Sequence, residues 1–67
     1  MAYLTPNQIR LLRELEDHGG VLIVRPRADR DDYDVLERMG LVESHALRSG
    51  EITHEITDAG RAALTAP

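Results

Sequence analysis

The fold of this chain is decided by residues 35–43, which read VLERMGLVE. Leu36 and Met39 are spaced as on one face of a helix. Gly40 is a typical helix stop, and Leu41-Val42 then begins an extended segment. The stretch therefore predicts a helix that runs to about Met39 and passes through a glycine into a strand.

Upstream of this junction, the same helix is expected to follow a short arginine-rich loop and to be capped by Asp29 or Asp31. Its helical periodicity divides the side chains between two arcs. We expect the inner arc to carry Asp32, Val35, Leu36 and Met39. We expect the outer arc to carry Arg30, Tyr33, Asp34, Glu37 and Arg38.

The N-terminal part of the chain predicts a first helix that begins at Pro6 and ends near Asp17. Thr5 is a suitable N-cap, and Gln8 completes a capping box with it. The run VLIV at residues 21–24 follows two glycines and is mostly β-branched, so we expect a buried strand there.

Downstream, the segment that begins at Leu41 leads through residues 48–51, RSGE, to a second extended run at residues 52–56. This pattern predicts a hairpin, and Thr57 can cap a short last helix that reaches Leu64. The expected fold is an α+β, winged-helix-like single domain over residues 1–67: helix, strand, helix, β-hairpin wing, short C-terminal helix. Its expected core is Leu12, Leu15, Leu36, Met39, Leu41 and Ile56.

Residues 35–43 and the later stretch EITDAGRAAL at residues 55–64 resemble winged-helix transcriptional regulators of the MarR and PadR kind. The resemblance implies a recognition helix followed by a wing, and DNA binding in transcriptional regulation in a bacterium or phage. Those families place a further helix before the recognition helix, and residues 24–29 leave no room for it. We therefore expect a trimmed version of the fold.

The overall charge of the chain disfavours DNA binding, and the feature that favours it is a set of arginines. The net charge is −4, whereas free-standing DNA-binding domains are usually basic. Residues 29–39 carry two arginines and five acidic side chains, which disfavours insertion of that helix between rows of phosphates. We expect contacts mainly to phosphates, from Arg25, Arg27, Arg30, Tyr33, Arg38 and Arg48. The alternative is an acidic module that docks on another protein or on a second copy of the chain.

The histidines raise a second possibility at the hairpin. A two-residue turn at Ser49-Gly50 would place His45 opposite His54 and Glu43 on the same face. Such a cluster suits zinc, but a cross-strand aromatic pair explains the same residues, and we expect no metal or cofactor.

Enzymatic activity and membrane insertion have little support in the sequence. The chain has no cysteine and no glycine-rich phosphate loop, and a domain of this size has little room for a catalytic cleft. No apolar run approaches the roughly 20 residues that span a bilayer, and no signal-type segment is present. We expect a non-enzymatic cytoplasmic protein with no small-molecule substrate.

Overall fold

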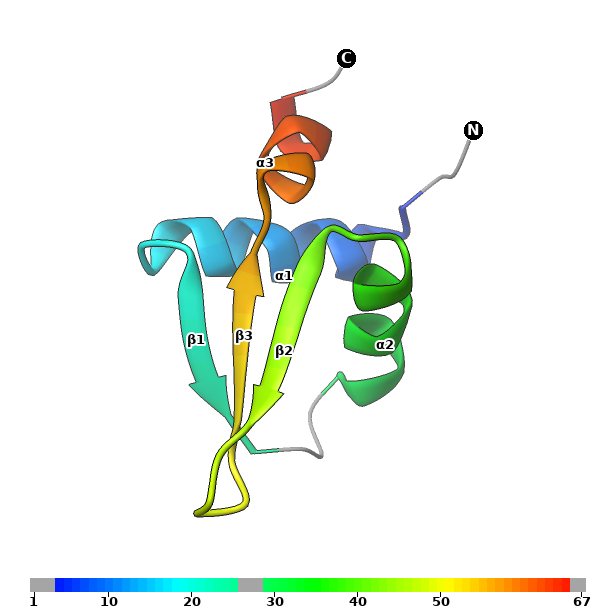
Figure 1. Ribbon diagram of the computed structural model, residues 1–67. Helices are drawn as coiled ribbons and strands as arrows, with labels where there is room; N and C mark the ends of the chain where they lie inside the picture. Colours follow the sequence, from blue (N-terminus) through cyan, green and yellow to red (C-terminus); the bar gives the residue numbers. More distant parts are fainter. Residues whose placement is uncertain (1–3, 26–28, 66–67) are drawn as a thin grey trace.

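The computed structural model describes residues 4–25 and 29–65. Its elements follow one another as α1 (Pro6–Asp17), β1 (Val21–Val24), α2 (Arg30–Arg38), β2 (Val42–Ala46), β3 (Ile52–Ile56) and α3 (Asp58–Thr65) (Figure 1). This order confirms the predicted α+β, winged-helix-like topology.

The three strands form one antiparallel sheet in the order β1-β3-β2, with β3 in the centre. One face of the sheet is covered, because Val42, His54 and Ile56 point into the core beneath α1 and α2. The alternate residues of each strand lie on the other face, which we call the open face. It carries Val21, Ile23, Glu43, His45, Thr53 and Glu55.

Helix α1 begins as the sequence predicts. The Gln8 amide nitrogen donates to Thr5 Oγ1 at 3.2 Å, and the Thr5 amide nitrogen donates to Gln8 Oε1 at 3.0 Å. The capping box is therefore confirmed, and so is the end of the helix at Asp17. Leu11, Leu12 and Leu15 bury the apolar stripe of this helix.

The start of α2 differs from the prediction. Asp29 occupies the N-cap position in a left-handed conformation, with φ 55° and ψ 26°, and makes no capping hydrogen bond. Asp31 lies inside the helix and is not its cap. The Asp29 carboxylate is instead turned towards α1, where it accepts hydrogen bonds from Asn7 Nδ2 at 3.1 Å and from an Arg10 guanidinium nitrogen at 3.2 Å.

The two arcs of α2 are also rotated relative to the prediction. Tyr33, placed on the outer arc, is buried, and Val35, placed on the inner arc, is 37% exposed. The reason is that α2 packs against both α1 and β2, so the covered arc is centred on Tyr33 and Leu36. Hydrophobicity alone favoured Val35, but its side chain lies about 100° round the helix from that of Leu36.

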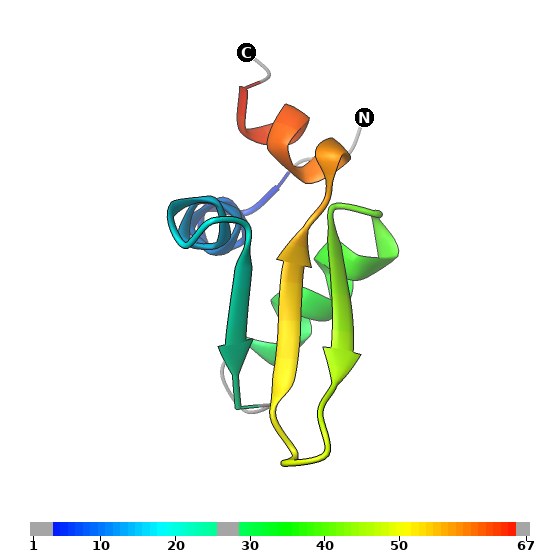
Figure 2. The same cartoon turned by 60° about the vertical axis from the view of Figure 1, so that its left-hand side comes forward.

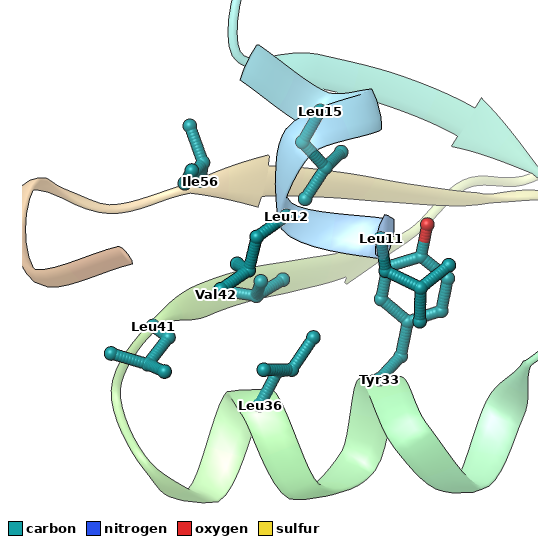
Figure 3. Packing of buried hydrophobic residues seen from close by; sticks show 8 residues of the cluster. All are labelled: Leu11, Leu12, Leu15, Tyr33, Leu36, Leu41, Val42 and Ile56. Atoms are coloured by element: carbon teal, nitrogen blue, oxygen red, sulfur yellow. The ribbon is translucent and has the colours of Figure 1, made fainter. Parts of the chain in front are cut away.

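The core contains most of the residues predicted for it. Leu12, Leu15, Leu36, Leu41 and Ile56 are buried together, whereas Met39 is only partly buried at the margin. Leu11, Tyr33 and Val42 complete the cluster, which joins both main helices to the hairpin (Figure 3).

The hairpin register is displaced by one residue from the prediction. The Leu47 amide nitrogen donates to the Glu51 carbonyl oxygen at 2.8 Å, which leaves a three-residue turn at residues 48–50. Gly50 has φ +90° and takes the left-handed position that such a turn requires. Ser44 therefore pairs with His54, and His45 pairs with Thr53 on the open face.

Strand β1 is less buried than predicted, because no described helix covers the open face of the sheet. Val21 and Ile23 are 40% and 56% exposed on the open face. Only the alternate side chains of β1, those of Leu22 and Val24, face the covered side of the sheet.

Helix α3 is capped by Thr57, whose Oγ1 accepts a hydrogen bond from the Gly60 amide nitrogen at 3.0 Å, as predicted. Gly60 packs so closely that a Cβ there would collide with the Leu41 carbonyl oxygen and the Ile56 side chain. The first described residue of the chain and the end of α3 both lie away from the hairpin turn (Figures 1 and 2). None of the described helices has the length and apolar character needed to cross a bilayer.

Candidate nucleic-acid interface

Three of the arginines predicted to contact DNA come to one end of the molecule. Arg25 follows the last residue of β1, Arg30 begins α2, and Arg48 lies in the hairpin turn. The end of β1, the start of α2 and the hairpin turn all lie at the lower end of the view in Figure 1. We call Arg25, Arg30 and Arg48 the arginine end. The fourth loop arginine, Arg27, falls outside the described residues.

The other two predicted contact residues do not join this group. Arg38 is the last residue of α2, which spans nine residues and so rises by about 12 Å from Arg30. Tyr33 is 4% exposed, with its ring packed in the core. Its expected place on the outward face, from which it would contact DNA, is therefore wrong, because the rotation of α2 turns it inwards.

The acidic residues beside the arginine end are held by α1. Gln8, itself 6% exposed, donates from Nε2 to Asp32 Oδ1 at 3.1 Å, and Asn7 Nδ2 donates to Asp32 Oδ2. Asp29 forms its ion pair with Arg10 of α1. Among the described residues, no ion pair involves Arg25, Arg30 or Arg48. Within the described part of the chain, Arg25, Arg30 and Arg48 are thus not neutralised by ion pairs with the neighbouring aspartates.

The outward face of α2 remains acidic. Asp31, Asp34 and Glu37 are exposed along it. Carboxylates at these positions repel phosphates, so the geometry places the favourable charge at the arginine end and the unfavourable charge along the helix.

A hollow of about 300 Å³ lies between α2 and the hairpin. It is lined by Arg30, Tyr33, Asp34, Glu37, Ser44, Ile52 and His54. His54 is 5% exposed, with its Nδ1 2.7 Å from Ser44 Oγ. Its ring stacks on that of Tyr33.

The surroundings of His54 and Tyr33 favour the uncharged forms of both side chains. Burial lowers the pKa of His54 below 6.5, an effect opposed by the nearby carboxylates of Glu37 and Asp34. Burial raises the pKa of the Tyr33 hydroxyl, with smaller contributions from Glu14 and Asp29. At neutral pH the stack therefore adds no positive charge to the arginine end.

Sequence reasoning missed the Ser44–His54 pair because of the turn length. The signal was Gly50, which suits the last position of a three-residue turn as well as it suits a two-residue turn. The same shift separates His45 from His54, because the two side chains lie on opposite faces of the sheet. The imagined zinc cluster is therefore excluded, and within residues 4–25 and 29–65 no other group of metal-ligating side chains is assembled.

These features define a small α+β domain of winged-helix-like topology with one arginine-bearing end. The chain belongs to the DUF3860-like family, whose model matches residues 5–66 and so covers every helix and strand. No curated protein matches the chain.

Proposed function

We propose that this domain binds double-stranded DNA in transcriptional regulation and that it does so mainly through phosphate contacts at the arginine end. The observation that supports this proposal is that Arg25, Arg30 and Arg48 belong to three chain segments that lie towards the same end of the molecule. Guanidinium groups match phosphate geometry well, and α1 already engages the neighbouring Asp29 and Asp32. The resemblance of residues 35–43 and 55–64 to winged-helix regulators supports the same function.

The charge of α2 constrains how the duplex lies. Because Asp31, Asp34 and Glu37 are exposed, the helix does not enter the major groove with its outward face. Arg48 in the hairpin turn, together with Arg25 and Arg30, contacts the sugar–phosphate backbone instead. Such contacts carry little sequence information, so sequence preference is weak and affinity depends steeply on salt.

The test is a titration of a fluorescent duplex by anisotropy at about 50 mM and about 200 mM salt. Replacing Arg30 and Arg48 by alanine should flatten the salt slope by about one to two units. Arg38→Ala, at the other end of α2, is the matched control and should have a smaller effect. Replacing Asp34 by asparagine and Glu37 by glutamine should strengthen binding, because it removes repulsion from phosphates. Absence of a complex for the wild type at about 50 mM salt would refute the proposal.

A second function is favoured by the outward face of α2. Asp31, Asp34 and Glu37 are exposed there beside Val35, which is 37% exposed. An acidic surface with an apolar residue suits a basic protein partner. In that case the variant with Asp34→Asn and Glu37→Gln would lose binding to the partner, whereas the same variant gains affinity for DNA under the first proposal.

A further inference from the structure

Among residues 4–25 and 29–65, no strand pairs with the outer edge of β1, which we call the free edge. Strand β1 pairs with β3 on one side and is the last strand of the sheet on the other. The Ile56 amide nitrogen donates to the Gly20 carbonyl oxygen at 2.8 Å, and antiparallel ladders bond through alternate residues. Leu22 and Val24 therefore bond to β3, while the backbone groups of Val21, Ile23 and Arg25 point to the free edge.

Residues 21–24 of this edge are wholly aliphatic. Their sequence, VLIV, contains no charge and no proline, whereas exposed edges are commonly protected by such residues or by bulges; the one charge on the edge, Arg25, follows them. Ile23 lies between Val21 and Arg25 on the free edge. Its side chain is 56% exposed, and that of Val21 is 40% exposed. An aliphatic edge of this kind is a template for another strand.

We propose that a second copy of this chain pairs with this edge, β1 against β1 in antiparallel orientation, with Ile23 opposite the partner's Ile23. The two sheets then form one six-stranded sheet about a two-fold axis. This interface shares Arg25 with the arginine end, but it needs no nucleic acid and is measured without it.

The register follows from the direction of the free backbone groups. Only residues that point to the edge can bond across it, so Val21, Ile23 and Arg25 must pair among themselves. When the two-fold axis passes Ile23, Val21 pairs with the partner's Arg25, and all three residues bond across the edge. When the axis passes Leu22, Arg25 is left out of the ladder, and when it passes Val24, Val21 is left out.

The charges on the open face favour the same register. Glu43 on β2 is directly opposite Glu55 on β3, and Glu55 is directly opposite Val21 on β1, so the three side chains form a row across the sheet. Like charges in this position are destabilising. In the proposed pairing, the partner's Arg25 is next in the row and lies two strands, or about 10 Å, from Glu55. Its aliphatic stem covers Val21 while its guanidinium reaches towards Glu55, and the two-fold axis repeats this contact.

The first experiment is the mass of the free protein by sedimentation equilibrium over a range of concentrations. We expect an average mass that rises from 7.5 kDa towards twice that value. Ile23→Lys places two like charges on the two-fold axis and should weaken association by about tenfold or more. His45→Lys, an exposed residue of the same face on the opposite edge strand, is the matched control and should leave association unchanged.

Two further variants test the register and protect the result against misfolding. Arg25→Glu and Glu55→Arg should each weaken the dimer, and the double variant should recover most of the lost affinity, because the two charges exchange places. Ile23→Pro removes only a donor that faces the free edge, so circular dichroism should show a folded monomer. A wild-type mass that stays at 7.5 kDa up to about 1 mM would overturn the proposal. So would a dimer that survives both Ile23→Lys and Ile23→Pro.

Discussion

The imidazole of His54 lies flat on the ring of Tyr33, with the ring centroids 3.6 Å apart and 8° between the ring planes. The sequence has no phenylalanine and no tryptophan, so this stack provides the aromatic packing between α2 and the central strand. Stacking of this kind contributes beyond the area that it buries. A polar ring in the core also makes the stability of the fold sensitive to protonation.

We expect the protein to lose stability as the pH falls through the pKa of His54. Burial lowers this pKa below 6.5 in the folded state, so below pH 6.5 the unfolded chain binds the proton more readily. The stability present above that pH is then lost as the pH falls towards the folded pKa. The melting temperature of the wild type should fall between about pH 7.5 and about pH 5. His54→Phe, which keeps a stacked ring, should reduce that fall, whereas His45→Gln on the open face should not. Equal pH dependence in all three proteins would contradict the assignment.

Removal of the Asp32 carboxylate should destabilise the protein through Gln8. The buried Gln8 amide donates to Asp32 at 3.1 Å, and a buried donor left unpaired costs about 1–3 kcal/mol. Asp32→Ala should lower the free energy of unfolding by that amount in urea titrations. Asp31→Ala, one position away on the exposed face of α2, is the control and should change stability much less. Similar losses in the two variants would show that the contact between α1 and α2 does not depend on this bond.

Gly60→Ala should destabilise the protein although alanine is the better helix former. A Cβ at this position collides with the Leu41 carbonyl oxygen and with Ile56, and overpacking of this kind costs about 1–3 kcal/mol. This penalty opposes a gain in helix propensity of about 1 kcal/mol. Ala62→Gly, an exposed position of the same helix, measures the propensity effect alone. A more stable Gly60→Ala protein in thermal melts would mean that α3 moves away from the sheet without cost.

Leu36→Ala should produce the loss typical of a core cavity. Leu36 is fully buried at the meeting of α2 with α1 and the sheet (Figure 3), and truncation of such a residue costs about 2–5 kcal/mol. Val35→Ala, the neighbouring partly exposed position, is the control. A loss below about 0.5 kcal/mol for Leu36→Ala would show that α2 packs through another face.

The sequence predicts the order of helices and strands because each boundary has a local chemical cause. Thr5 and Gln8 cap α1, Gly40 ends α2, and Thr57 caps α3, and each of these acts within a few residues. The predicted contact set is less complete, since Arg38 lies apart from the arginine end and Tyr33 is buried.

The errors concern choices that depend on contacts far along the chain. Asp29 bonds to α1 rather than to its own helix, because Asn7 and Arg10 compete for its carboxylate. The rotation of α2 is fixed by two neighbours at once, so Tyr33 turns inwards. The face that His54 occupies depends on a difference of one residue in the hairpin turn, which local turn preferences do not decide.

The placement of the two ends of the described chain has a practical consequence. The start of the described chain and the end of α3 lie at the opposite pole from the hairpin turn (Figures 1 and 2). A tag, a fluorophore or a fused protein attached at either position therefore extends away from Arg48. The domain can be tethered to a sensor surface by either end with its arginines still presented to the solution.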